Sequence, residues 1–480
     1  MNLLIVCILT YVLLQLAIGI WASRGIKTEQ DYLLAGRNLG PGLTLFTVFA
    51  TWFGAETCIG SAGEAYSGGL AAVTTDPFGY ALGIFITGLV FAVPLWKRKL
   101  TTLADLFRRR YGIGVERLAA ILMVPTSLLW AAAQIRAFGQ VLTASSELEV
   151  TFAITVAAAV VVIYTMLGGM LADALSDLLQ GVVLIIGLAA LGFIVMVNGD
   201  GWDKLGNVSA EAATLLPASQ PWLATLEAWA IPVLGTVCAQ EMISRIISAR
   251  SPAIASRATV SASFLYLAVG LIPVGIGLIG PQIAAGLEHP EQVLMHVARQ
   301  NLGTVLYIVF VGALVSAILS TVNSALLVAG SLTAHNLVMP LLPKLDEQHK
   351  VLFNRVAVVA FGVIAYVMAL MSDSVYALVE EASSLGSAGV LVCMLFALWG
   401  GRIGGALSAG AALIAGITVY VGGQHVFELP YPYLTSLAAA LAAYLLAAIY
   451  PCATRSLFKL TKATRIHDRT PVHDVGRDSS

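Results

Sequence analysis

Charged residues are scarce in this chain: Asp, Glu, Lys and Arg together make up 11% of its 480 residues. Soluble domains carry about a quarter charged residues, so this composition argues against a soluble multi-domain protein. The formal net charge of −1 provides no basic surface for nucleic acid. Instead, 58% of the residues are hydrophobic and the mean hydropathy is +0.87. The composition predicts a polytopic protein embedded in a lipid bilayer.

Sequence patterns for catalysis and metal binding are also lacking. The five cysteines are scattered through apolar runs without metal-ligand spacing, so we expect small core residues rather than a disulfide framework. The seven histidines fall mostly in expected loops and in the C-terminal tail, with no paired spacing. We therefore expect neither an enzyme nor an obligatory protein partner.

Apolar runs of about twenty residues mark thirteen candidate membrane spans. The first run has no positively charged start and no small-residue cleavage site, which favours a spanning helix over a signal peptide. The polar segment after about residue 460 is expected to be a disordered tail. The expected spans are 2–22, 41–66, 75–96, 118–143, 150–168, 177–198, 222–243, 259–284, 302–334, 353–371, 376–399, 403–422 and 431–451.

The distribution of basic residues predicts the orientation, because cytoplasmic loops are enriched in Lys and Arg. With the N-terminus outside, the inner loops and the tail hold all 26 basic residues except Lys204, Arg299 and Arg136. An error of one span would reverse every later loop and destroy this partition. We therefore expect thirteen spans in the plasma (cell inner) membrane, with the C-terminus in the cytoplasm.

The stretch from Ala50 to Gly60 is unusual for a membrane span, because it carries Trp52, Glu56 and two glycines. Ionisable residues at this depth are costly and indicate a functional site by default. Irregular helices in a bilayer are tolerated only where they are buried in protein or line a cavity. The stretch therefore predicts a binding site inside the membrane, as in solute carriers.

Further polar groups fall within or beside the expected spans. Asp173 and Asp177 share a helix face, which suits cation capture or places two charges at a helix end near water. Ser316, Ser320 and Ser324 recur with helical spacing, which fits either helix packing or oxygen ligands for sodium. Structural ion pairs or interfacial positions are alternatives for the remaining charges: Glu64, Arg136, Glu241, Arg245, Glu380 and Glu381.

Five segments, in this order, resemble the sodium:solute symporter family of proline, glucose, sialate and choline transporters. They are residues 32–41, 50–60, 168–180, 245–251 and 316–321. The resemblance extends over all thirteen spans. It implies an all-α polytopic membrane protein with a five-plus-five inverted-repeat, LeuT-like core, in which helices 2 and 7 are broken.

The domain organisation that follows has five parts. The first span and an inner loop occupy 1–40, helices 2–6 occupy 41–200, and helices 7–11 occupy 201–400. Helices 12 and 13 occupy 401–460, and the cytoplasmic tail occupies 461–480.

The resemblance also implies a sodium (Na⁺) site between helices 2 and 9. Asp177 matches an acidic residue near the family's sodium path, and with Ser324 it is a candidate for a second ion site or an ion path. Asp173 lies outside the family pattern. The implied sodium ligands are the carbonyls of Ala50, Phe53 and Ala317 and the hydroxyls of Ser320 and Thr321.

Parts of the substrate region are similar to choline transporters. Their aromatic cage positions fall on Trp52, Tyr80 and Trp130, and aromatic faces attract quaternary ammonium groups. The fourth cage position falls on Ala239 rather than a tryptophan, which argues against choline itself. Glu56 would help to neutralise a cationic solute if it faces the pocket. The candidate solutes are a quaternary or other cationic amine, or otherwise an amino acid, sugar or carboxylate.

We therefore expect a sodium-coupled secondary active symporter that imports a small organic solute by alternating access. Coupling requires only that sodium and solute each bind better when the other is present. A proton-coupled carrier of the same fold is an alternative, because Glu56 and Asp177 can both titrate. A channel is a less favoured alternative.

Overall fold

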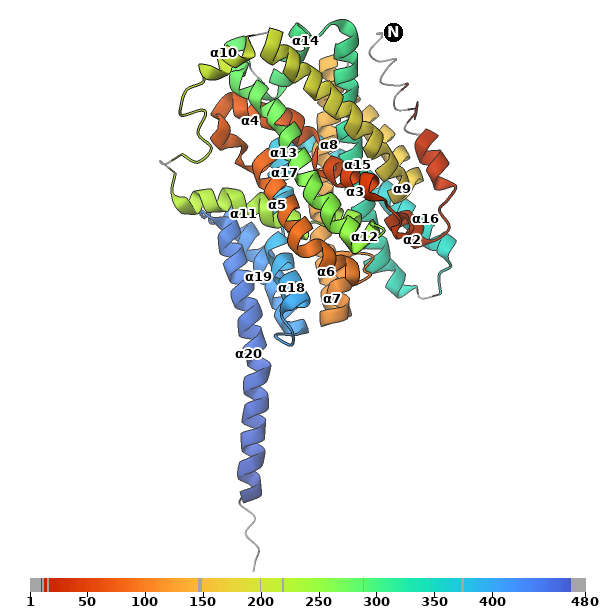
Figure 1. Ribbon diagram of the computed structural model, residues 1–480. Coiled ribbons are helices and arrows are strands. Elements are labelled where there is room, and N and C mark those ends of the chain that lie inside the picture. The colour runs from red at the N-terminus through yellow and green to blue at the C-terminus, as the bar shows by residue number, and fades with distance from the viewer. Residues whose placement is uncertain are drawn as a thin grey trace, which may run out of the picture.

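The computed structural model describes residues 10, 13–14, 17–145, 149–198, 200–217, 220–287, 289–342, 344–372 and 375–467. Within these ranges the chain is a bundle of helices without named strands (Figure 1). Nine of the described helices are long and apolar enough to cross a membrane, or up to eleven if each of two bent pairs is one span. The all-α membrane fold is confirmed, and the count of thirteen spans stays a prediction. The first expected span lies partly outside the described residues.

The second expected span is broken in the middle. α3 (Pro41–Trp52) is followed after a bend of 58° by η2 (Glu56–Gly60) and α4 (Ser61–Gly68). Phe53 leaves the helical conformation, with φ −83° and ψ 76°. Gly54 then donates its N–H to the carbonyl of Trp52 at 3.0 Å instead of to a residue one turn earlier.

The seventh expected span is broken in the same way. α11 (Trp222–Cys238) and α12 (Gln240–Ser248) meet at 42°. Ala239 between them is extended, with φ −66° and ψ 126°. Such breaks free backbone groups that can bind ligands inside a membrane protein. The expectation that helices 2 and 7 are broken is confirmed.

α15 (Thr304–Ser331) packs against both α3 and the two longest helices beside it, α8 (Ile113–Ser145) and α9 (Val150–Phe193). Two expected spans are merged in α9 but divide at Gly169, where φ is 62°. A side chain would be strained at this φ, and its Cβ would lie 2.8 Å from the carbonyl oxygen of Tyr32. Glycine therefore allows the chain to turn tightly against its neighbour.

The other helices surround this centre. Large apolar side chains point outward, including Val305 and Met371, which are 74% and 81% exposed and suit contact with lipid. α20 extends away from the bundle (Figure 1), and the expected tail begins within it, while 468–480 lie outside the described residues. The remaining main helices are α5 (Tyr80–Ile86), α6 (Ala92–Lys97), α13 (Pro252–Ile283), α16 (Glu347–Met371), α17 (Val375–Ser384), α18 (Ser387–Trp399), α19 (Ala406–His425) and α20 (Pro432–His467).

Candidate ion and solute sites

Four of the five expected sodium ligands lie together where α3 meets α15. Thr321 on α15 directs its hydroxyl to the carbonyls of Ala50 and Ala317, each at 3.1 Å. Ser320 donates to the same Ala50 carbonyl at 3.5 Å. Phe53, the fifth expected ligand, is the first residue after α3. We call these five residues the ion group.

The chemistry of the ion group fits sodium. Hard cations take oxygen ligands, and this group offers carbonyl and hydroxyl oxygens in a buried position. The two hydroxyls now donate to the carbonyl of Ala50. A bound cation would replace these hydrogen bonds with direct oxygen contacts. Whether these residues bind sodium stays a prediction.

Asp177 on α9 joins the ion group through Ser320. Its carboxylate accepts hydrogen bonds from Ser320 on α15 and from Thr47 on α3, and its side chain is fully buried. No salt bridge to Asp177 is found within the described ranges. A buried carboxylate held by hydroxyls rather than by a basic side chain can attract a cation.

Asp173, four residues earlier, is held differently. It forms a fully buried salt bridge with Arg245 on α12 and accepts hydrogen bonds from Asn323 and Ser324. Ser324 also donates to the carbonyl of Ser320 at 3.0 Å. The structure thus places Ser324 beside Asp173, whereas Asp177 bonds to Ser320. The Asp173–Arg245 pair connects the second broken helix to α9.

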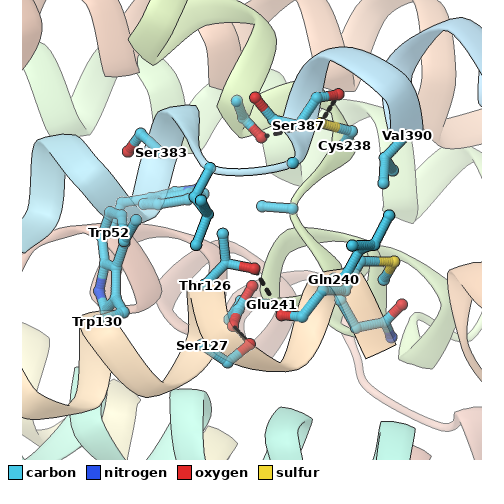
Figure 2. Close-up of a pocket in the computed structure, with 17 residues that line it drawn as sticks. Trp52, Thr126, Ser127, Trp130, Cys238, Gln240, Glu241, Ser383, Ser387 and Val390 are labelled. Atoms are coloured by element: carbon cyan, nitrogen blue, oxygen red, sulfur yellow. Dashed lines mark hydrogen bonds between the residues drawn. The ribbon is translucent and has the colours of Figure 1, made fainter. Parts of the chain in front are cut away.

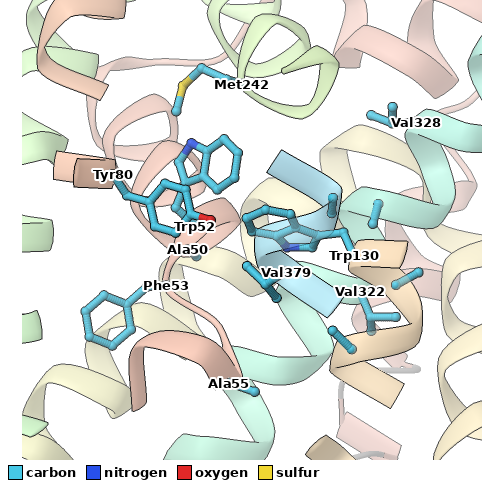
Figure 3. Packing of buried hydrophobic residues seen from close by; sticks show 14 of the residues in the cluster. Ala50, Trp52, Phe53, Ala55, Tyr80, Trp130, Met242, Val322, Val328 and Val379 are labelled. Atoms are coloured by element: carbon cyan, nitrogen blue, oxygen red, sulfur yellow. The ribbon is translucent and has the colours of Figure 1, made fainter. Parts of the chain in front are cut away.

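Three of the expected substrate residues form one aromatic cluster (Figure 3). Trp52 stacks on Tyr80 with ring centroids 5.3 Å apart, and Trp130 approaches Trp52 edge-on at 4.7 Å. The hydroxyl of Tyr80 lies 2.7 Å from that of Ser383 on α17. The indole N–H of Trp52 is buried and has no hydrogen-bond partner among the described residues. This cluster begins at the last residue of α3.

A cavity of about 50 Å³ opens beside the aromatic cluster (Figure 2). We call it the solute pocket. Its walls come from α8, from the break between α11 and α12, and from α17 and α18. Trp52, Trp130 and Ala239 line it, whereas Tyr80 and Glu56 do not. A single water needs roughly 10–15 Å³ in this measure, so the pocket has room for a small chemical group and must widen for a larger solute.

Glu241 is the only carboxylate that lines the solute pocket in the part of the chain described, and sequence reasoning left its role open. It lies in the first turn of α12, two residues after Ala239, and accepts a hydrogen bond from Ser127 on α8 (Figure 2). Its position directly after the break is the sequence signal that could have indicated the pocket.

Glu56 instead lies beyond the break in α3, away from the pocket lining. It is fully buried and accepts a hydrogen bond from Gln134 on α8. Sequence reasoning did not single out Gln134, because an amide in the middle of a long apolar helix carries no spacing pattern. The expected role of Glu56 in substrate binding stays a prediction.

Solved structures with the same arrangement of helices are transporters. The chain superimposes with a TM-score of 0.81 on a Na⁺-coupled sialic acid symporter in a substrate-bound outward-open state, at 16% identity, covering 94% of this chain and 98% of the other. Mhp1, a nucleobase-cation-symport-1 family transporter, gives a TM-score of 0.61 at 18% identity, covering 88% and 94%. These likenesses define the fold as that of the LeuT-fold transporters.

The sequence identifies the particular family within this class. The model of the sodium:solute symporter family matches residues 32–416, so the chain belongs to that family. It is 27% identical to the human high affinity choline transporter 1 over 469 residues, covering 90% of this chain and 78% of the relative. It is 25% identical to a sodium/proline symporter of Staphylococcus aureus over 454 residues, covering 88% of each.

Proposed function

We propose that the protein is a sodium-coupled symporter that moves a small organic cation across the membrane by alternating access. Membership of the sodium:solute symporter family supports sodium as the coupling ion. The observation that carries the solute class is the charge of the solute pocket. Two indoles and one carboxylate line it, and none of the residues found to line it is Lys, Arg or His.

The two kinds of group in the pocket complement each other for a cation. Trp52 and Trp130 offer aromatic faces, which attract a positive charge by about 0.5–2 kcal/mol. Glu241 accepts a hydrogen bond from Ser127 at Oε1, and no side-chain donor to its Oε2 is found among the described residues, so that Oε2 would be the atom to accept a solute N–H group. The indole N–H of Trp52 has no hydrogen-bond partner among the described residues, so a solute that reaches it would gain from carrying a hydrogen-bond acceptor. We infer a cationic amine that also carries an oxygen acceptor.

The position of Trp52 explains how ion and solute would be coupled. Ala50 and Phe53 of the ion group flank Trp52 at the end of α3. An ion that orders the carbonyls at this break would also fix the indole that faces the solute. Each ligand would then favour the helix conformation that the other needs, which is the thermodynamic requirement for coupling.

We also propose the plasma membrane as the location, with the N-terminus outside and the C-terminus in the cytoplasm. Basic residues gather at the end of α6 and in the following segment, where Arg109 donates to the carbonyls of Arg98 and Lys99. Arg37, before α3, reaches the same region by donating to the carbonyl of Leu100. Such clustering supports this end as the cytoplasmic side.

Uptake by purified protein in proteoliposomes tests the proposal. An inward sodium gradient should drive accumulation of at least one cationic amine from a panel that also holds amino acids, sugars and carboxylates. Uptake that persists undiminished when potassium replaces sodium would overturn sodium coupling. Accumulation of only neutral or anionic solutes would overturn the solute class.

Glu241→Gln tests the carboxylate within the same assay. Loss of a charged hydrogen bond of about 1.5–3 kcal/mol should raise the amine concentration for half-maximal uptake about tenfold or more, with sodium dependence little changed. Glu64→Gln is the matched control, because Glu64 lies on α4 and does not line the pocket. Equal effects of the two variants would contradict the role of Glu241.

A further inference from the structure

Three side-chain oxygens converge beside Gly54, the second residue after the end of α3. A Cβ at this position would lie 2.7 Å from Glu56 Oε2, 2.8 Å from Gln134 Oε1 and 2.9 Å from Thr321 Oγ1. Distances below 3.0 Å would force these atoms to move, so the cluster depends on the absence of a side chain. We call this space the Gly54 cradle. Its oxygens come from the first residue of η2, from α8 and from α15.

The carboxylate in the Gly54 cradle has no basic partner. Glu56 is fully buried, and no salt bridge to it is found among the described residues. Its Oε1 has no hydrogen-bond partner there either. Asp76, which accepts hydrogen bonds from Thr57 at 2.7 Å and from Tyr266 at 2.8 Å, is a second buried carboxyl group, held by the residue that follows Glu56. An ionised carboxylate at such a buried position is costly unless an opposite charge compensates it.

Hydrogen bonds in the cradle brace the break without supplying that positive charge. Gln134 donates its amide N–H to Glu56 and accepts the backbone N–H of Ala55 at 3.0 Å. The amide oxygen of Gln134 and the hydroxyl of Thr321 remain close to the carboxylate. Carboxylate, amide and hydroxyl oxygens in one buried space are the donor set of a hard cation.

We propose that Glu56, Gln134 and Thr321 bind a second sodium ion at the Gly54 cradle. Thr321 is shared with the ion group, so that the two sites are adjacent. The inference rests on the proposed sodium coupling and assigns Glu56 to the ion rather than to the solute. It implies that two sodium ions bind per carrier, one at the ion group and one at the cradle.

Direct measurement of ²²Na⁺ binding to the purified carrier tests the second site without relying on transport. Wild-type protein should bind two sodium ions. Gly54→Ala, which fills the cradle but removes no ligand, and Glu56→Gln, which removes the charge, should each bind one. Gly42→Ala on α3 is the matched control, because a Cβ at Gly42 meets nothing within 4 Å. This control should still bind two ions.

Two outcomes separate this inference from the proposed function. If wild-type protein binds a single sodium ion, or if Gly54→Ala and Glu56→Gln both bind as many ions as wild type, the cradle site is wrong while sodium coupling stands. If wild-type protein binds no sodium, the proposed coupling itself fails. Thermal unfolding of each variant identifies misfolding, and Glu56→Gln, which retains the shape of the side chain, serves if Gly54→Ala does not fold.

Discussion

The ion group and the solute pocket are built in different ways although they share the end of α3. The ion group combines backbone carbonyls with the hydroxyls of two adjacent residues of α15. The solute pocket is formed by side chains from α8, the α11–α12 break, and α17 with α18, all facing Trp52. Carbonyl positions follow from where a helix ends, whereas a pocket made of side chains can change with single substitutions. The comparison suggests a constant ion chemistry beside a variable solute chemistry.

Breaking the Asp173–Arg245 salt bridge should have the largest effect, which is a loss of stability. Arg245→Met leaves Asp173 buried without a counter-charge, which should lower the free energy of unfolding by about 3–5 kcal/mol. Arg250→Met, at an exposed position shortly after α12, should have little effect. Denaturant unfolding in detergent measures both. The double variant Arg245→Met, Asp173→Leu should recover most of the loss, because no charge is then left unpaired.

A stability loss in Arg245→Met equal to that in Arg250→Met would show that the buried pair does not hold α12 against α9. The position of α12 against α9 would then depend on packing alone. Failure of the double variant to recover stability would instead indicate that Asn323 and Ser324 need the carboxylate of Asp173 as their acceptor.

A medium effect is expected from a single hydroxyl of the ion group. Thr321→Ala removes an oxygen worth about 1.5–3 kcal/mol to a charged partner, so the sodium concentration for half-maximal uptake should rise about tenfold or more. Thr321→Ser retains the hydroxyl and should remain close to wild type. Uptake measured across sodium concentrations in proteoliposomes gives the comparison. A fall in solute affinity with unchanged sodium dependence would place Thr321 with the solute pocket instead.

The same contrast explains how much could be predicted from sequence. Ala317, Ser320 and Thr321 lie on one helix at fixed spacing, so their common face followed from the pattern, and the resemblance placed Ala50 opposite them. The breaks in helices 2 and 7 were also expected and are confirmed. The role of Glu241 depends on Ser127 and Ala382 reaching the same cavity from distant parts of the chain. Helical spacing within one segment carries no information about contacts between residues that are far apart in the sequence.

The contacts of Glu56 and Ser324 could not be predicted from the sequence pattern, although both residues lie close to the ion group in the chain. Glu56 follows Trp52 by about one turn and was a candidate substrate residue if it faced the pocket, which stays a prediction; the break at Phe53 interrupts the helical spacing between the two residues. The carboxylate of Glu56 meets Gln134. Ser324 lies one turn beyond Ser320 and was grouped with Asp177, yet Arg245 and Asp173 hold it. Both outcomes depend on long-range partners rather than on local sequence.

The smallest of these effects should come from a single aromatic face in the solute pocket. Trp130→Ala removes one face of the aromatic cluster, and a cation–π contact of about 0.5–2 kcal/mol corresponds to roughly two- to thirtyfold weaker amine binding. Sodium dependence should stay unchanged, because Trp130 contributes no oxygen to the ion group. Trp399→Ala, at a site 51% exposed on the outer surface, is the control. Competition by a panel of amines would measure both variants. If Trp130→Ala weakened neutral and cationic solutes equally, the indole would act by filling space, and the selectivity for cations would rest on Glu241 alone.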